Sequence, residues 1–415
     1  MPSPITVVTV ALLAVGLVLS RYCYPLYQVI ARTRQNMPLF NWTSRTKPVE
    51  HRTMKSIRTL LKPDTNIHTI LLDRAIPNQR LVRAFELTNT FVSPEPAIRD
   101  EFRKGASRML ERANRRGWAD YFEVALDATK ASLPAANNTR PFDHFIQSTT
   151  LRVVLIVLLG VEQRAEELDE DDLQIVAQLI SELWARSKTE SSTDPEKLYH
   201  LNRHIRRLVP DDEAFPSPLD FVIPAWETMW RAVATTVAYT HDEQPYRETF
   251  GQLKAGNPTR SFTASASDSD GPSAQAIVSE VLRLHPPSRH IHRAVHRPFF
   301  GVPTFLDRFI HRTRLEAADI ASFHRSKEVW GPSANDFDPA RHGESVVEGR
   351  TILPFGYGPL QCMAKSWAPL AIGVMVSAIL EVLGSEDTTS FTLVRGERIG
   401  GREGWQGWEV KRQEK

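Results

Sequence analysis

The chain is poor in cysteine, because only two occur in 415 residues, Cys23 and Cys362. A small secreted protein held together by disulfides needs more, so the sequence argues against a disulfide framework and indicates a reducing compartment. A basic excess is also missing, since 51 lysines and arginines stand against 49 acidic residues and the formal net charge is +2. That balance argues against nucleic acid as a partner, which needs a clustered basic surface.

Charge is absent from Ile5–Ser20, a run of 16 residues. Basic residues follow it, beginning at Arg21, and none precedes it, so the positive-inside rule places the bulk of the chain on the cytoplasmic side. The run is slightly shorter than the about 17 to 25 residues of a usual span. A cleaved signal peptide is the alternative, although a basic n-region and a small-residue cleavage site are missing. We therefore predict a single-pass anchor over 1–20, a basic connector over 21–50 and one large domain over 51–415.

Helical patterns dominate this domain. From about residue 50 to about 255 most of the sequence reads as helix, and the apolar run Leu151–Val161 predicts a buried core helix too short to span a membrane. The acidic run at 166–172 predicts a solvated helix start. A shorter helix holds SEVLRLHPP and stops at its two prolines. Residues 298–315 read as short extended pieces, so strands are expected in the last third of the chain.

The segment Pro354–Ala364, PFGYGPLQCMA, places glycines in front of a cysteine that opens an apolar helical run. A thiolate at a helix N-terminus is a good soft ligand, because the helix end and nearby N–H groups stabilise its charge. Gly356 and Gly358 let the backbone approach a flat object closely, and Phe355 offers an aromatic wall. These features describe a cradle for an iron porphyrin with Cys362 as axial ligand. A buried free cysteine and a nucleophile are the alternatives.

Two more patterns concern a buried network. Glu280 and Arg283 are three residues apart and share one helix face, where they can pair, although a solvated ion pair has the same spacing. His324–His342, HRSKEVWGPSANDFDPARH, is a long irregular stretch whose Arg341 can reach a buried carboxylate. An irregular loop of this length needs a structural reason. A network that joins Glu280, Arg283 and Arg341 supplies one.

The three motifs, in this order, resemble those of the cytochrome P450 family. F-x-x-G-x-x-x-C-x-A over Phe355–Ala364 is similar to its haem-binding loop, E-x-x-R to its K-helix motif, and HR-x-x-x-x-WG-x-x-A-x-x-F-x-P-x-R to its meander. The resemblance implies the cytochrome P450 fold, mainly α with a small β portion, preceded by a single N-terminal transmembrane helix. It makes 51–415 the haem-binding catalytic domain. It assigns haem to Cys362, as ligand of the iron, and to Phe355, Gly358 and Ala364.

The family also has a distal helix that carries an acid and an alcohol above the iron, and Phe221–Tyr239 is the candidate. Its A-W-E-T at 225–228 resembles A-G-x-E/D-T-T, with methionine in place of the second threonine. The resemblance gives Glu227 and Thr228 the catalytic role of a proton relay to dioxygen. An ion pair between Glu227 and Arg231, four residues later, is the alternative. Pro224 either starts this helix or bends it.

The sequence departs from the family where the haem propionates are held. Leu360 stands where the family usually has a basic residue, and the W-x-x-x-R of the family's C helix is not evident. Two carboxylates need cationic or hydrogen-bonding partners if they are buried. The predicted partner is Arg289, and the alternatives are His290, Arg293, Arg103 and Lys104.

The resemblance implies a haem-thiolate monooxygenase anchored in lipid of the endoplasmic reticulum, with its catalytic domain in the cytoplasm. It takes electrons from an NADPH-dependent flavoprotein reductase, activates dioxygen and oxidises an apolar small molecule; the motif spellings are most similar to fungal members that act in secondary-metabolite biosynthesis. Three alternatives remain: a haem-thiolate isomerase or dehydratase that uses no dioxygen, a degenerate binding protein without haem, and a cysteine hydrolase with Cys362 as nucleophile and His342 or another histidine as base.

Overall fold

Helices make up most of the chain before residue 285, as the sequence predicted. The computed structural model describes residues 48–135, 138–189, 194–254, 257–264, 271–298, 311–343, 351–384 and 391–412. The predicted anchor and most of the connector lie outside the described residues. The helices of this part are α2 (Met54–Leu61), α3 (Ile67–Phe85), α4 (Pro96–Ala131), α5 (Phe142–Val153), the π-helix η2 (Val154–Leu159), the 3-10 helix η3 (Ala165–Glu167), α6 (Glu170–Arg186), α7 (Pro195–Leu208), α8 (Leu219–Trp226), α9 (Met229–Thr240), α10 (Gln244–Gly251), α11 (Pro258–Thr263) and α12 (Ala274–Leu284).

Several of these helices begin at a residue that caps them. Asn66, Asp169 and Ser273 precede α3, α6 and α12, and each side chain accepts a hydrogen bond from the backbone N–H three residues further on. The acidic run predicted as a solvated helix start does begin α6. One of its members, Asp172, is nevertheless buried, because it pairs with His204 of α7.

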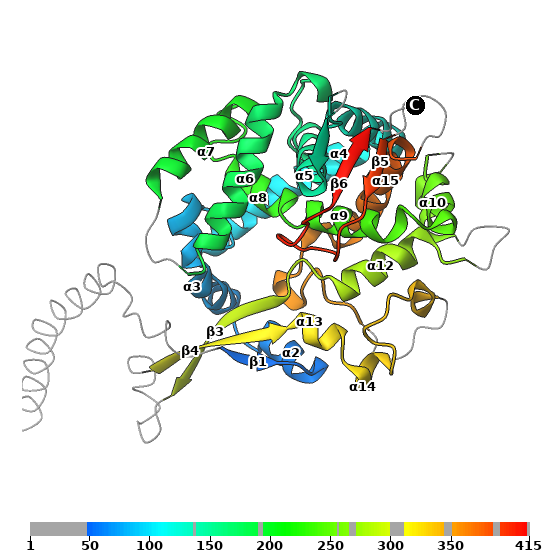
Figure 1. Cartoon of the computed structure of the whole chain (residues 1–415). Helices are drawn as coiled ribbons and strands as arrows, with labels where there is room; N and C mark the ends of the chain where they lie inside the picture. The colour runs from blue at the N-terminus through cyan, green and yellow to red at the C-terminus, as the bar shows by residue number, and fades with distance from the viewer. Residues whose placement is uncertain are drawn as a thin grey trace, which may run out of the picture. The chain divides into compact units, whose positions relative to one another are not determined.

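Strands form two small three-stranded sheets. In the first, β1 (Val49–His51) is parallel to β4 (His311–Asp319), and β4 is antiparallel to β3 (His290–Pro298). In the second, β6 (Glu409–Arg412) pairs antiparallel with β2 (Thr139–Pro141) and β5 (Phe391–Val394). Figure 1 shows β3 and β4 as long paired strands with α2 beside them. Most strand residues lie in the last third, as predicted, but β1 and β2 come from the first half and complete the two sheets.

The apolar run around Leu151 lies in the core. Phe142–Leu159, made of α5 and η2, is the one helix in the described part long and apolar enough to cross a membrane, and 89% of it is buried inside the fold. Its composition is therefore explained by the core. Gly160, with φ +77°, ends it in a conformation that glycine adopts without strain. The helix is longer than predicted, because it begins at Phe142, nine residues before the run.

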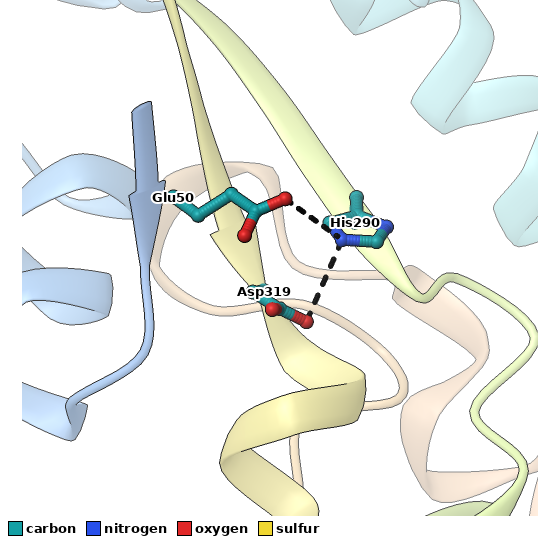
Figure 2. A group of neighbouring side chains, drawn as sticks. All are labelled: Glu50, His290 and Asp319. Carbon is teal, nitrogen blue, oxygen red and sulfur yellow. Dashed lines mark ion pairs between the residues drawn. The ribbon is translucent and has the colours of Figure 1, made fainter. Parts of the chain in front are cut away.

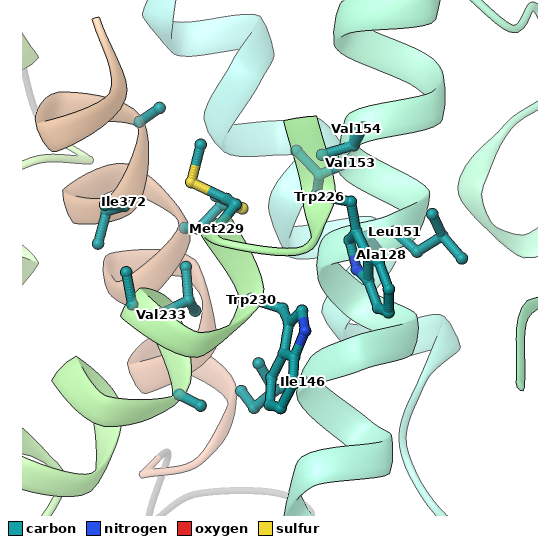
Figure 3. Packing of buried hydrophobic residues seen from close by; sticks show 14 of the residues in the cluster. Ala128, Ile146, Leu151, Val153, Val154, Trp226, Met229, Trp230, Val233 and Ile372 are labelled. Carbon is teal, nitrogen blue, oxygen red and sulfur yellow. The ribbon is translucent and has the colours of Figure 1, made fainter. Parts of the chain in front are cut away.

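The predicted distal helix, Phe221–Tyr239, is wrong as a single element, because α8 ends at Trp226 and α9 begins at Met229. Pro224 lies inside α8 and has no N–H to donate, which favours an early end. Figure 3 shows Trp230 beside Ile146 of α5 and Trp226 beside Leu151, with Met229 toward α15. The break between α8 and α9 is thus held from both sides by the core.

The stretch between α12 and the cysteine is more regular than the sequence indicated. Within His324–His342, predicted to be irregular, α14 (Lys327–Trp330) and the 3-10 helix η4 (Pro339–His342) form, and α13 (Ile320–His324) precedes them. The loop with the cysteine contains the 3-10 helices η5 (Gly358–Leu360) and η6 (Met363–Ser366), and α15 (Ala368–Val382) follows.

Candidate active site around Cys362

The cysteine lies in a loop that closes on itself. The Cys362 N–H donates to the Phe355 carbonyl at 2.9 Å, and the Gly356 N–H donates to the Leu353 carbonyl at 3.0 Å. Gly356 and Gly358 both have φ +74°, which a side chain rarely allows. A Cβ on Gly358 would stand 2.9 Å from a carbonyl oxygen at the end of α2. This glycine therefore packs against α2, and its predicted contact with a ligand stays a prediction.

Cys362 does not open an α-helix directly, and that prediction is wrong by six residues. It precedes the four-residue η6, and α15 begins only at Ala368. The sulfur accepts a hydrogen bond from the Ala364 N–H, which lowers the pKa of the thiol, but burial outweighs it and the pKa is raised. The residue as a whole is nevertheless exposed, so solvent reaches it although many protein atoms surround the sulfur. Such a sulfur is accessible to a ligand, and a bound metal deprotonates a coordinating thiol.

The two residues predicted beside the cysteine anchor the loop in the core. Phe355 and Ala364 are half-buried and pack against the main hydrophobic cluster. On the other side, the Ile291 side chain of β3 lies 3.7 Å from the position that a Cβ on Gly356 would take. The loop is therefore held between the helical core and the first sheet.

The residues predicted as a network do meet. Glu280 and Arg283 are fully buried, and Arg283 binds the carboxylate with two hydrogen bonds of 2.7 Å. Arg341 donates from Nε to Glu280 Oε1 at 2.9 Å, and His342 lies 2.9 Å from Oε2. Burial alone raises the pKa of Glu280, but Arg283, His342 and the Asp338 N–H lower it to about 2. His342 is thus a further member of the network around Glu280.

His324 connects this network to the cysteine loop, a role that the sequence did not reveal. Its Nδ1 lies 3.1 Å from the Arg283 carbonyl, and its Nε2 accepts from the Leu353 N–H at 2.8 Å. Nδ1 therefore carries the proton of a neutral imidazole. Burial lowers the pKa of His324 to about 3. The Leu353 carbonyl in turn accepts the Gly356 N–H, so hydrogen bonds run from Arg283 to the loop.

Glu227 and Thr228 lie at the break between α8 and α9. Glu227 is buried, and two guanidinium groups hold its carboxylate: Arg231 reaches Oε2 at 2.6 Å and Arg402 reaches Oε1 at 2.9 Å. The ion pair with Arg231 that the spacing allowed is thus present. Thr228 is half-buried and makes no side-chain capping bond to α9. The sequence gave no signal for Arg402, because it lies 175 positions away in a loop.

Two buried arginines are not fully hydrogen-bonded within the described residues. Arg293 of β3 and Arg74 of α3 are 7% and 8% exposed, and the Nε of each has no hydrogen-bond partner within the described residues. The pKa of Arg74 is lowered to about 9, first by burial and then by the charges of Arg293 and Arg99. Arg99 also donates to the Pro359 carbonyl of the cysteine loop at 3.3 Å. Asp73 offsets part of the Arg293 charge, and the two buried Nε groups without a partner in this part of the chain fit a cofactor with two carboxylates.

Three of the other predicted propionate partners are exposed, and their contact with haem stays a prediction. Arg289 is exposed, with Nη2 3.4 Å from the position of a Cβ on Gly401, and Arg103 and Lys104 are exposed on α4. Arg293, named as an alternative, fits better. Arg74 was missed, because an arginine inside a helical pattern normally indicates a solvated face.

His290, the remaining alternative, belongs to an ion-pair cluster at the edge of the first sheet (Figure 2). Its Nε2 lies 3.8 Å from Glu50 Oε1 and 3.5 Å from Asp319 Oδ1. The three ligand atoms lie within 4.8 Å of one another, as a metal site requires. Arg52 nevertheless binds both carboxylates, at 2.6 and 3.1 Å. The negative charge is thus already matched, and the cluster joins β1, β3 and β4.

Part of the chain is similar in sequence to known proteins. The sequence model of the family described as "Cytochrome P450" matches residues 269–387, which include the buried network and the cysteine loop but not Glu227 or Thr228. Cytochrome P450 714A2 of Arabidopsis thaliana is 30% identical over 108 residues, which are 25% of this chain and 20% of that protein. Putative cytochrome P450 cyp-13B1 of Caenorhabditis elegans is 40% identical over 89 residues, 21% of this chain and 17% of that protein. The matches span about a fifth of the length of these relatives.

Solved structures show the same fold over nearly the whole chain. A 6-coordinated cytochrome P450 from Thermus thermophilus is similar with a TM-score of 0.59 and 15% identity, over 88% of this chain and 92% of that one. CYP154A1 from Streptomyces coelicolor is similar with a TM-score of 0.57 and 14% identity, over 87% of this chain and 90% of that one. At such identities the likeness concerns the fold alone.

Proposed function

The chain belongs to the cytochrome P450 family, with haem as the cofactor, and on that premise we propose that it is a haem-thiolate monooxygenase whose iron is bound by Cys362. The observation that carries the proposal is the connection between the cysteine loop and the buried network. Arg283, paired with Glu280, donates to the His324 and Ala334 carbonyls and so fixes the chain near Trp330. His324 in turn accepts a hydrogen bond from the Leu353 N–H at the start of the loop. A ligand held in this way keeps its geometry when the metal changes its state.

The residues around the site have separate roles in this proposal. Cys362 supplies the axial thiolate, Phe355 and Ala364 hold its loop on the core, and Arg293, Arg74 and Arg99 neutralise the propionates. When bound, the haem supplies the electron-transfer and dioxygen chemistry. Arg289 stays a weaker candidate for the propionates, because its guanidinium lies against the loop of Gly401.

Proton delivery is proposed for the break between α8 and α9. Thr228 offers a hydroxyl in the two-residue turn between α8 and α9, and Glu227 next to it can order water around its carboxylate. A hydroxyl and a carboxylate so placed can pass a proton toward the distal side of the site. Of the two groups, the Thr228 hydroxyl is the better candidate for proton transfer, because Arg231 and Arg402 already occupy the oxygens of Glu227.

That double ion pair favours a second candidate, a haem-thiolate isomerase or dehydratase without dioxygen. A carboxylate held by two guanidinium groups gives up hydrogen-bonding capacity that a relay uses. The two candidates differ in what they consume. A monooxygenase consumes NADPH and dioxygen together with substrate, whereas the isomerase converts substrate without either.

The finer assignments belong to the same proposal. An NADPH-dependent flavoprotein reductase supplies the electrons, and the substrate is a largely apolar small molecule of a secondary-metabolite pathway. The uncharged run Ile5–Ser20 anchors the chain in the endoplasmic reticulum membrane, with the domain after Glu50 in the cytoplasm. Removal of residues 1–47 is expected to release the protein from membranes on sedimentation and to leave its haem absorption unchanged. Continued membrane association of the shortened chain would contradict the anchor.

The first experiment is an absorption spectrum, ferrous with carbon monoxide minus ferrous alone, on the parent and on Cys362→Ala. The parent should show the red-shifted Soret band of thiolate ligation, and the variant should lose it. Thr228→Ala is then compared with the parent during turnover with a reductase. In a monooxygenase the variant should still consume NADPH but convert less of it into product. A folded parent without any haem signal would contradict the enzyme proposal and favour a binding protein without haem.

A further inference from the structure

Four cationic side chains converge on the break between α8 and α9, from parts of the chain that are far apart. Arg231 of α9 and Arg402 of the loop before β6 both bind Glu227. Arg80 comes from α3, and Lys188 follows the end of α6; the charge of each acts on the other and on Arg402. Glu227 is the only carboxylate that these interactions involve within the described residues. The group, which we call the distal cation cluster, thus carries an excess of positive charge.

A tryptophan holds two members of the distal cation cluster together. The guanidinium carbons of Arg80 and Arg402 each lie 4.8 Å from the centroid of the Trp184 ring. Arg80 also donates from Nη1 to the Ser187 hydroxyl at 2.6 Å. No carboxylate of the described residues pairs with Arg80. Stacking on an aromatic face orients a guanidinium and leaves its edge available for an oxyanion.

The positive charges of the distal cation cluster repel one another, which helps to lower the pKa of its members. The pKa of Arg80 is lowered to about 10, first by burial and then by the charge of Arg402. The pKa of Lys188 is also lowered, first by partial burial and then by Arg402 and Arg80. Like charges that are drawn out of water repel strongly unless an anion lies between them. Glu227 provides one negative charge, which leaves the cluster short of anions.

The distal cation cluster lies beside the strand that contacts the cysteine loop. Arg231 donates to the Pro287 carbonyl at 2.8 Å, just before β3. Arg289, two residues later, lies against Gly401, next to Arg402. Ile291 of β3 reaches the glycine at position 356 of the cysteine loop. One short segment, 287–291, therefore connects the cluster with the loop that carries the proposed haem ligand.

We propose that the distal cation cluster binds a carboxylate of the substrate, so that the enzyme acts on an organic acid with an apolar body. This inference rests on the proposed function. The guanidinium of Arg80, oriented by Trp184, receives the carboxylate, and Arg402 adds its positive charge while its Nε and Nη2 stay bound to Glu227. Lys188 adds a mobile charge, and Arg231 keeps Glu227 from competing with the ligand. The apolar remainder of the substrate then extends toward the cysteine loop.

The test uses the haem-loaded full chain and three probes of equal length: dodecanoate, its methyl ester and dodecyltrimethylammonium. Binding is followed by the change in haem absorption. Dodecanoate should bind about 10- to 100-fold more tightly than the ester, and added salt should reduce the difference. Arg80→Gln should remove this preference and leave binding of the ester unchanged. Arg83→Gln, on the exposed face of the same helix, is the matched control and should bind all three probes like the parent.

Two outcomes would overturn the inference. Equal binding of dodecanoate and its ester by the parent removes the need for a carboxylate site. Loss of haem from Arg80→Gln, with haem retained by Arg83→Gln, would mean that the cluster serves the propionates of the cofactor.

If the parent bears no haem, the proposed function fails, and the same probes are compared by thermal unfolding. A stabilisation by dodecanoate that Arg80→Gln loses would still support the site, and equal shifts in both proteins would contradict it.

Discussion

At the residue scale, the buried carboxylate of Glu280 explains why the segments around it have fixed positions. Its oxygens receive hydrogen bonds from Arg283, Arg341, His342 and the Asp338 N–H. A charge removed from water is tolerated only when its lone pairs are satisfied in this way. The same atoms that satisfy the charge therefore specify the path of the chain between α12 and the cysteine loop.

Arg283→Lys is expected to destabilise the protein by about 3–5 kcal/mol, because a lysine cannot replace both bonds to Glu280 and the bonds to the His324 and Ala334 carbonyls. The measurement is the free energy of unfolding in urea. Lys254→Gln is the control, since its ion pair with Glu381 is nearly half exposed on both sides, and it should change stability by less than about 1 kcal/mol. Equal effects of the two variants would show that burial of the pair is unimportant.

Two glycines of the cysteine loop have the same φ and different surroundings. Gly356→Ala should cost about 1–2 kcal/mol, the strain of a side chain at φ +74°, since a Cβ there meets only ordinary contact with Ile291 at 3.7 Å. Gly358→Ala adds an overlap with the Leu61 carbonyl at 2.9 Å, so we expect a further loss of about 1–3 kcal/mol and weaker haem retention. Unfolding curves and haem content are measured for both. A variant at 356 that is as unstable as that at 358 would contradict the packing role of Gly358.

What the sequence could reveal at this scale depended on spacing. Glu280 and Arg283 share a helix face, so their pairing follows from local geometry. Arg341 could be predicted as a member of the network only because an irregular segment as long as His324–His342 needs a structural reason. His324, Arg74 and Arg402 were missed, because each acts through a contact with a residue far away in the chain. No local pattern distinguishes a buried arginine from one on a solvated helix face.

At the scale of elements, the break between α8 and α9 depends on two tryptophans. Both are fully buried, and their rings stack with centroids 6.3 Å apart. Trp226 Nε1 donates to the Gln147 carbonyl and to the Thr150 hydroxyl of α5, at 3.2 and 3.1 Å. Trp230 Nε1 has no partner within the described part of the chain. The end of α8 is therefore tied to α5 by hydrogen bonds, whereas α9 is held by packing.

This difference gives a comparison of two similar substitutions. Trp226→Phe and Trp230→Phe remove about the same buried area, but only the first removes hydrogen bonds, and the second removes an unsatisfied N–H. We expect Trp226→Phe to be less stable than Trp230→Phe by about 1–3 kcal/mol. Urea unfolding measures the difference. If the order is reversed, the donor of Trp226 does not hold α8.

The elements themselves were largely predictable, and their ends were not. Apolar periodicity indicated α12 and α15, and the prolines after Leu284 marked the end of α12. The start of α15 was placed six residues early, because the sequence around Cys362 is as apolar as the helix and the 3-10 turn gives no separate signal. The break after Trp226 was also missed, since the apolar pattern continues across it. In both cases the contacts of the segment decided where the regular helix begins or ends.

At the scale of the whole molecule, neutral buried histidines make stability depend on pH. Burial lowers the pKa of His285 to about 4 and that of His324 to about 3, whereas an unfolded histidine has a pKa of about 6.5. Below pH 6.5 the unfolded chain therefore binds more protons than the folded chain, so stability falls as the pH falls. The loss continues until the pH passes the folded pKa values. The window between about pH 6.5 and pH 3 is thus expected to be the range in which these two histidines weaken the fold.

His285→Phe tests this dependence, because the ring of residue 285 lies beside that of Tyr239, with centroids 5.6 Å apart, and phenylalanine keeps that contact. The substitution leaves the Tyr239 hydroxyl without its partner at 3.0 Å, which costs the same at every pH. The informative quantity is therefore the difference in unfolding free energy between pH 7 and pH 5. In the parent it should include about 1–2 kcal/mol from this histidine, which the variant should lack. An equal pH difference in both proteins would mean that His285 is already charged in the folded state or accessible to protons without unfolding, and the acid sensitivity would then rest on His324.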